Sequence, residues 1–430
     1  MIARAPGPLP LTEAQDAIWS AQGAEGTNPI FNLGQYIDIR GPLDVEAFRA
    51  AITATLSEAD ALAVRIIDAP GGPQQVIHAS ARPHVEVIDL TTTNDPVHEA
   101  HIQLERDLRT AITLTVDALA REVLFILDRD RYFWYQRIHH LVIDGYGMAM
   151  VTARVCDAYT TCLAGRALGS TAFGAFESVL ADDAAYRTSD RRERDRRFWL
   201  ETFEDRPEVV GLSDGPAITS REVRHAAIDA NEAAAPLHAI AMRTNVPWPD
   251  LLIALVAAYV AHQVDRREVV LGVPSMNRLG TSAARVPAAV TNVLPVRIPV
   301  DANASLESFV TATSLRLRKA RRHGTYRSER LRHDLALADG MRLYGPIVNV
   351  LPFDLVPDLP GATSTLHVLS TGPVDDLAIT LRADASDNRL RIELDANPTL
   401  YAEKDVVQHA EHLAAFFRSS AAAIATARDD

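Results

Sequence analysis

The chain has 430 residues and a formal net charge of −13, and 47% of its residues are hydrophobic. This length suits two domains or one large pseudo-repeated unit, and it supplies a core that needs no disulfide or metal support. An acidic chain lacks the basic surface that binds nucleic acids, so we expect no nucleic acid partner. No stretch approaches 18 uninterrupted apolar residues, so we expect no membrane-spanning helix.

The N-terminus and the cysteines indicate an intracellular protein. Residues 1–15 contain no apolar signal-peptide core, so we expect a cytoplasmic, reducing location. Cys156 and Cys162 fall in one predicted helix, on faces about 120° apart, so they should not pair and read as structural thiols. No stretch has a metal-ligand spacing, so we expect no metal site.

The first half of the chain alternates predicted helices and strands. A helix opens at residues 11–19, where Thr12 is the expected N-cap and Gln15 completes a capping box. An amphipathic helix follows at residues 44–57. The predicted strands are residues 35–39, 62–68, 74–78, 116–127 and 132–139, and another helix follows at residues 148–163.

The second half repeats this alternation. A charged helix is predicted at residues 187–203, and a loose stretch with glycine and proline at residues 204–220 marks a candidate boundary. The later predicted helices are residues 233–242, 249–263, 306–322 and 402–425, and the strands are residues 223–228, 268–273, 347–350, 365–369, 377–381 and 390–394. Helices and strands interspersed in both halves predict two α/β bodies with a cleft between them.

One run, HHLVIDG at residues 139–145, carries the parts of an acyl-transfer site. Neighbouring strand residues face opposite ways, so one of His139 and His140 should pack inward while the other projects toward a substrate. An imidazole can take a proton from an attacking nucleophile, and the helix beyond Asp144 and Gly145 offers free N–H groups to an oxyanion. Gly145 permits a backbone shape that other residues resist. The alternative is a pair of core histidines beside a plain turn, but this combination occurs in ~1 in 1,000 random chains of this size.

The pattern HHxxxDG is the hallmark of nonribosomal peptide synthetase condensation domains, which the chain resembles over nearly its whole length. The run WYQRIHHLVIDG at residues 134–145 is similar to siderophore-type domains of the enterobactin kind. The other matching family motifs are residues 11–19, Phe198-Trp199, residues 276–280 and 292–295, His323, Tyr326, and residues 345–349 and 371–377.

This resemblance implies the fold and the partners. It implies an α/β fold of two chloramphenicol-acetyltransferase-like lobes in a V-shaped pseudo-dimer, with residues 1–185 carrying HHxxxDG and residues 186–430 carrying the bridging latch and floor segments. It also implies a donor carrier protein, an aryl carrier protein in the siderophore case, and an acceptor peptidyl carrier protein. These partners would supply phosphopantetheine, and no cofactor would be bound. A monomer, or part of a larger synthetase, is expected.

The resemblance also implies residue roles. His140 would be the catalytic histidine, as a base or as a group that positions the amine, and His139 would be structural. Asp144 would hold the loop through an arginine, beside Gly145. The arginine usual in the family's second motif is replaced here by Ala63.

That replacement leaves two candidate partners for Asp144, namely Arg65 and Arg278. Lesser candidates for substrate contact are Tyr146, Asn349, Ser370 and Thr371, each weighed against plain packing, capping or a strand end. The basic run at residues 316–322 is either a solvated helix face or a docking surface for an acidic partner such as a carrier protein.

We therefore expect an amide-forming condensation domain of a siderophore-type synthetase. The alternative is a free-standing condensation enzyme that forms an ester or amide with a soluble acceptor. A docking domain without activity would lack the motif histidine, and an epimerisation domain would need a glutamate-bearing motif that is not found. A CoA-dependent acyltransferase would use the same histidine and fold, so CoA stays open as a donor.

Overall fold

The computed structural model describes residues 7–23, 28–167, 173–213, 215, 220, 222–338, 340–351, 359–384 and 388–426. The chain falls into two compact units. The first comprises Met1–Thr188, Met276–Thr291 and Asp354–Gly372, and the second comprises Ser189–Ser275, Asn292–Phe353 and Pro373–Asp430. Two late segments thus belong to the first unit. The expected lobes, residues 1–185 and 186–430, and their V-shaped arrangement stay predictions.

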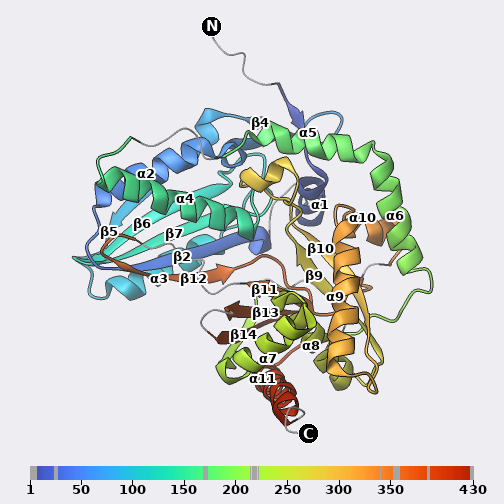
Figure 1. The fold of residues 1–430 in the computed structure, drawn as a ribbon. Coiled ribbons are helices and arrows are strands. Elements are labelled where there is room, and N and C mark those ends of the chain that lie inside the picture. Colours follow the sequence, from blue (N-terminus) through green and yellow to red (C-terminus); the bar gives the residue numbers. More distant parts are fainter. Residues whose placement is uncertain are drawn as a thin grey trace. The chain divides into compact units, whose positions relative to one another are not determined.

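The first unit is built on a five-stranded sheet in the order β12-β2-β7-β6-β5. All neighbours are antiparallel except β5 and β6. The edge strand β12 comes from late in the sequence and pairs with β2, as its orange colour shows in Figure 1. The strands are β2 (Asn32–Arg40), β5 (Val85–Asp89), β6 (Ala120–Asp128), β7 (Arg131–His139) and β12 (Thr363–Ser370).

Helices cover both faces of this sheet. On one face, Phe48 of α2 makes edge contacts with Trp134 of β7 and with Tyr159 of α4, at ring distances of 5.3 Å. On the other face, Leu104 of α3 joins a separate core cluster with Phe125 of β6. The helices of this unit are α1 (Glu13–Gln22), α2 (Val45–Glu58), α3 (Pro96–Leu108), α4 (Gly145–Leu163) and α5 (Phe176–Arg187), and a small sheet joins β1 (Leu9–Pro10), β4 (Gln74–Ile77) and β3 (Val64–Ile67).

The second unit holds a six-stranded mixed sheet in the order β10-β9-β11-β13-β14-β8. The pairs β9–β11 and β11–β13 are parallel, and the other pairs are antiparallel. The strands are β8 (Arg224–Asp229), β9 (Glu268–Ser275), β10 (Asn292–Pro299), β11 (Ile347–Leu351), β13 (Leu377–Asp384) and β14 (Arg389–Ala396). The helices are α6 (Asp190–Thr202), α7 (Asn231–Thr244), α8 (Trp248–Gln263), α9 (Leu306–Arg322), α10 (Ser328–Asp334) and α11 (Glu403–Thr426).

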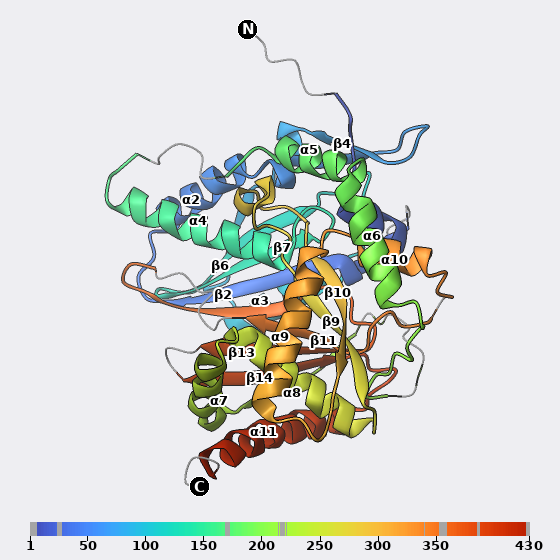
Figure 2. The same cartoon turned by 45° about the vertical axis from the view of Figure 1, so that its right-hand side comes forward.

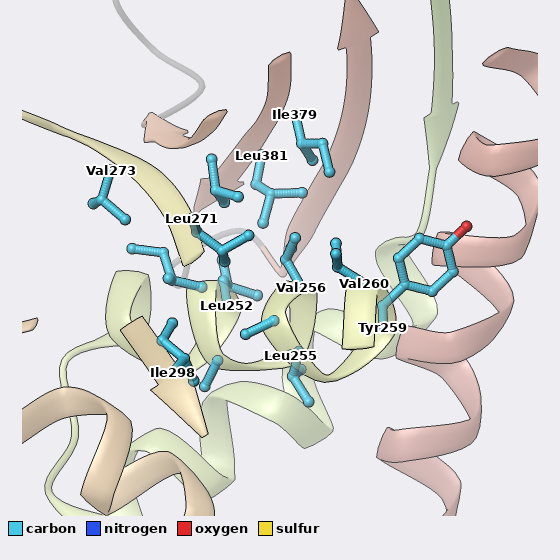
Figure 3. Packing of buried hydrophobic residues seen from close by; sticks show 14 of the residues in the cluster. Leu252, Leu255, Val256, Tyr259, Val260, Leu271, Val273, Ile298, Ile379 and Leu381 are labelled. Carbon is cyan, nitrogen blue, oxygen red and sulfur yellow. The ribbon is translucent and has the colours of Figure 1, made fainter. Parts of the chain in front are cut away.

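Helix α8 lies at the centre of the second core. Figure 3 shows Leu252 and Val256 of this helix facing Leu271, Ile379 and Leu381 of the sheet. All of these side chains are buried. A helix that is apolar nearly all round is expected where it is enclosed by other elements. Its burial therefore explains why residues 249–263 lack a polar face.

Most predicted elements are confirmed, including the capping box of Thr12 and Gln15. The prediction was wrong at several starts. Strand β2 begins at residue 32 rather than 35, β6 at 120 rather than 116, α4 at Gly145 rather than 148, and α6 at 190 rather than 187. The sequence reading also missed β1, β5, α3, α5, β10 and α10. Strand β10 contains two prolines, which are tolerated because it lies at the edge of its sheet.

Cys156 and Cys162 are both free thiols, as predicted. Within the described ranges, no group of histidine, cysteine or acidic side chains could hold a metal ion. In the same part of the chain no single helix is long and apolar enough to span a membrane, although α7 and α8, bent by 111°, pass that test as a pair by length and composition only.

Candidate active site

The HHxxxDG run forms the connection from β7 to α4 in the first unit. Strand β7 ends at His139, and the next residue continues the sheet by one bond, from its backbone N–H to the carbonyl of Phe31 at 2.8 Å. Leu141, Val142 and Ile143 then bury their side chains in the core. Asp144 is the N-cap of α4. Three buried apolar residues thus fix the loop that carries the polar ones.

His139 points inward and has both ring nitrogens occupied. Its Nε2–H donates to Gln22 Oε1 at 2.6 Å, and its Nδ1 accepts from the backbone N–H of Leu141 at 3.2 Å. The side chain is buried, and burial lowers the pKa of His139 to about 3, with a smaller contribution from neighbouring positive groups. His139 is therefore a neutral side chain that holds the loop against α1.

His140 is only half-buried and is held through one ring nitrogen. Its Nδ1 lies 2.9 Å from the carbonyl oxygen of Ile143. A carbonyl can only accept, so Nδ1 carries the proton and donates, and Nε2 is left with a lone pair. The loop thus selects the tautomer whose free nitrogen can accept a proton from a nucleophile.

Gly145 is the first residue of α4 and lies outside the left-handed region of backbone angles, so the backbone conformation that glycine permits is not used here. It is exposed, and the space that a side chain would occupy is open. The N–H groups in the first turn of a helix have no intrahelical acceptor, and the helix dipole adds partial positive charge there. Gly145 therefore leaves this end of α4 uncovered.

Asp144 is the anchor of the loop and is 1% exposed. Its Oδ1 caps α4 through the N–H of Gly147 at 2.8 Å and accepts from Arg278 Nη2 at 2.6 Å. Its Oδ2 accepts from the N–H groups of Val290 and Thr291 and from the Thr291 hydroxyl, at 2.8–3.1 Å. With both oxygens saturated, Asp144 is a structural group rather than a base.

The same contacts keep Asp144 ionised. Burial alone would raise its pKa, but the charge of Arg278 and the backbone hydrogen bonds outweigh burial and hold the pKa below its usual value. Arg278 is itself 2% exposed and donates to the carbonyls of Ala283, Val286 and Ala288 at 2.7–2.8 Å. The Asp144–Arg278 pair is thus buried among backbone N–H and carbonyl groups of the segment that carries Arg278.

Of the two sequence candidates, Arg278 is therefore the partner of Asp144. Arg65 lies exposed on β3, so this candidate is wrong. Tyr146 follows the motif on α4 and is 47% exposed. The Arg278 guanidinium lies 5.1 Å from the centre of its ring. The aromatic ring thus covers the arginine on the side toward α4.

The remaining candidates lie in both units. Ser370 ends β12 in the first unit, and the exposed Thr371 follows it. Asn349 lies on β11 of the second unit, opposite Thr380 of β13. The sequence reading matched residues 371–377 to a family motif but did not single out Gly372, whose position lies beside the His140 ring in the first unit. The dipeptide Gly372-Pro373 is a turn signal that could have drawn attention to it.

Several other motif residues have packing roles in the second unit. Phe198 stacks on His323 with ring centres 4.0 Å apart, and Trp199 Nε1–H donates to the His323 carbonyl at 2.9 Å. Asn292 donates to the carbonyls of Gly324 and Tyr326 at 2.9 and 2.8 Å. These residues tie α6, α9 and β10 together at one end of the sheet.

Comparison with known proteins identifies this arrangement. The family model for the condensation domain matches residues 6–426. The chain belongs to the condensation domain family. Condensation domains are acyltransferases that form amide bonds, so the recognition of an enzyme of this class from HHxxxDG is confirmed.

Named relatives include much longer proteins. The condensation domain is 39% identical over 414 residues to the dimodular nonribosomal peptide synthase of Bacillus subtilis (strain 168), covering 96% of this chain and 17% of that protein. It is 32% identical over 413 residues to enterobactin synthase component F of Escherichia coli O157:H7, covering 94% of this chain and 32% of that protein. The chain thus spans at most about a third of these two relatives.

Solved structures confirm the α/β fold class. A variant of the starter condensation domain of rhizomide synthetase RzmA, in complex with C8-CoA and Leu-SNAC, matches with a TM-score of 0.88 at 30% identity, covering 96% of this chain and 94% of that chain. VibH, a nonribosomal peptide synthetase condensation enzyme, matches with a TM-score of 0.86 at 26% identity and covers 98% of both chains.

Proposed function

We propose that this condensation domain joins a carrier-bound acyl or aryl group to an amine that a second carrier protein presents as an aminoacyl thioester. The product would be an amide in siderophore-type peptide synthesis. The observation that carries this proposal is the ring of His140, whose Nδ1–H donates to the Ile143 carbonyl and leaves Nε2 free. Relatives named enterobactin synthase and vanchrobactin synthetase support the siderophore assignment.

In the proposed reaction, the acceptor nitrogen attacks the thioester carbonyl carbon. A C–N bond forms, the C–S bond breaks, and the products are an amide and the free thiol of the donor carrier's phosphopantetheine arm. The amine proton passes to His140 Nε2 and from there to the departing sulfur. An α-amine has a pKa of about 7.7–8.0 and is partly neutral at pH 7, so His140 orients it as well as accepting its proton.

The oxyanion of the tetrahedral intermediate needs hydrogen-bond donors fixed in advance. The first turn of α4 supports this role, because Asp144 uses the N–H of Gly147 for capping and thereby fixes the start of the helix. We assign the backbone N–H groups of Gly145 and Tyr146 as the donors. The open space beside Gly145 favours close approach of a substrate oxygen.

The remaining residues have supporting roles in this proposal. His139 and the Asp144–Arg278 pair hold the loop, and Tyr146, Ser370 and Thr371 of the first unit would contact the substrate. The proposal places no cofactor in the protein itself, because both carrier proteins bring their own phosphopantetheine.

A free-standing enzyme that uses a soluble acceptor is a second candidate. The likeness to VibH, a protein described as a condensation enzyme, motivates this candidate. The two candidates share the first half-reaction and differ only in the nucleophile. An alcohol acceptor would depend more strongly on His140, because a hydroxyl does not lose its proton without a base.

The test is to incubate the protein with a dihydroxybenzoyl-loaded aryl carrier protein and a panel of aminoacyl carrier proteins, free amines and alcohols. Products are identified by mass spectrometry for the wild type, His140→Ala and the control His98→Ala, which changes an exposed histidine on α3. Amide formed only on a carrier-bound amino acid, and lost only in His140→Ala, supports the proposal. Product formed with a free acceptor favours the second candidate. Acyl transfer at the wild-type rate in His140→Ala would contradict both candidates.

A further inference from the structure

Gly372 lies against the catalytic edge of His140. A β-carbon built on Gly372 would lie 3.2 Å from His140 Cδ2 and 3.9 Å from Nε2. It would also lie 3.7 Å from Leu33 Cδ2 on β2. Residue 372 therefore occupies the side of the ring on which the free nitrogen lies, and a side chain here would take up space beside that nitrogen.

The His140 ring has little room to yield. Its Nδ1–H···O bond to Ile143 is 2.9 Å long, and tilting the ring away from residue 372 would lengthen or break this bond. That bond also selects the tautomer in which Nε2 is unprotonated. If the ring moves away from Ile143, it loses both this bond and this tautomer. A contact of 3.2 Å is closer than carbon atoms prefer, so a side chain at position 372 must displace something.

We propose that Gly372 is a positioning and specificity-determining residue, which keeps open the space where the acceptor nitrogen meets His140 Nε2. This inference rests on the proposed function of His140. A nucleophile must come within about 3.2 Å of the base that takes its proton. A methyl group at position 372 would compete for that space, and it would exclude bulky α-substituted amines more strongly than small ones.

A matched control is available because Gly372 has a backbone angle φ of +105°, where any side chain is strained. Gly72, in the turn after β3, has φ +109° and open space where a β-carbon would lie. Gly372→Ala and Gly72→Ala therefore share the backbone strain, and only the first adds an atom beside His140. Where Gly372→Ala fails to fold, Gly372→Asn replaces it, because asparagine tolerates positive φ better.

The first measurement is kcat/KM for transfer from a dihydroxybenzoyl carrier protein to glycyl- and leucyl-loaded carrier proteins. We expect Gly372→Ala to lower the leucyl-to-glycyl ratio at least tenfold, mainly through the KM for the acceptor, while Gly72→Ala leaves the ratio within twofold of the wild type. An unchanged ratio in Gly372→Ala, or the same change in both variants, overturns the inference.

The second measurement needs no acyl transfer and so separates this inference from the proposed function. Diethyl pyrocarbonate modifies free imidazole nitrogens, and peptide mapping by mass spectrometry follows its reaction at His140. We expect His140 to react at least fivefold more slowly in Gly372→Ala than in the wild type and in Gly72→Ala. Equal rates in all three proteins, or an unreactive His140 in the wild type, would mean that residue 372 does not guard an open nitrogen.

Discussion

Arg278 Nη2 lies 2.6 Å from Asp144 Oδ1, although 134 positions separate the two residues in the sequence. Their side chains are 2% and 1% exposed. This contact ties Met276–Thr291 to the loop that carries His140, within the first unit. The position of His140 therefore depends on a segment that lies more than 130 residues later in the sequence.

Removing the arginine should destabilise the protein strongly. Arg278→Ala leaves the Asp144 carboxylate buried without its charge partner, and breaking a buried pair from one side costs about 3–5 kcal/mol. We expect the free energy of unfolding, measured in urea, to fall by that amount. Arg65→Ala, which changes the exposed arginine on β3, should change it by no more than about 0.5 kcal/mol. Equal effects of the two substitutions would contradict the pairing.

The Asp144 carboxylate should also make stability depend on acid. Its pKa in the folded protein lies below the ordinary value of 3.8, so its contribution is fully present above pH 3.8 and is lost as the pH falls through the folded pKa. Asp144→Asn lacks this charge at every pH. The difference in unfolding free energy between the wild type and Asp144→Asn should therefore be largest above about pH 5 and shrink in more acidic buffer. A constant difference would argue against an ionised Asp144.

Glu122 should act in the opposite direction. It is buried on β6, accepts from Trp134 Nε1–H at 2.8 Å and Gln136 Nε2–H at 3.1 Å, and burial raises its pKa to about 7 despite these bonds. A carboxyl whose folded pKa is raised contributes stability below pH 4.5 that is lost as the pH rises toward 7.

Glu122→Gln keeps the shape without the charge. Relative to the wild type it should therefore gain about 3 kcal/mol of stability between pH 4 and pH 8. Glu201→Gln, at an exposed position on α6, should show no such gain. The measurement is urea unfolding across this pH range, and a parallel response of the two variants would refute the raised pKa.

The end of α9 offers a prediction about partners. Arg316, Arg318, Lys319, Arg321 and Arg322 are all exposed there, and Arg321 also pairs with Asp250 at 2.7 Å. Figure 2 shows this helix running beside β10, with which it packs. In a chain of net charge −13, we predict that this cluster contacts an acidic carrier protein rather than forming a plain solvated helix face.

Replacing Arg316, Arg318, Lys319 and Arg322 by glutamate should weaken binding of a loaded carrier protein at least tenfold in low salt, as measured by titration calorimetry. Replacing the three arginines by lysine keeps the charge and should change binding less than threefold. Wild-type affinity should also fall as salt screens the charges. If neither charge reversal nor added salt weakens binding, this surface is a solvated helix face rather than a docking site.

Sequence reasoning reached much of the fold because the local signals agreed. The capping box at Thr12 and Gln15 and the helix predicted at residues 306–322 match α1 and α9 closely. The misses have physical causes. Helix α3 is largely polar, and its buried residues are only Ala100 and Leu104. Strand β10 tolerates prolines only because it lies at an edge, which no local pattern reveals.

The site was partly predictable for a similar reason. Opposite directions for His139 and His140 follow from the alternation of a strand, and the structure places one inward and one half-exposed. The choice between Arg65 and Arg278 and the closeness of Gly372 to His140 are long-range contacts, which spacing along the chain does not encode. The start of α4 at Gly145 rather than at residue 148 follows from the Asp144 cap, whose strength depends on a buried partner.

The most direct test of the account is the single-turnover rate of amide formation, measured by rapid quench with a dihydroxybenzoyl carrier protein and an aminoacyl carrier protein. We predict that His140→Ala lowers this rate at least a hundredfold, the usual scale for a lost proton-transfer group, while His98→Ala stays within twofold of the wild type. A His140→Ala rate within threefold of the wild type, in a variant that unfolds at the same urea concentration, would contradict the central claim.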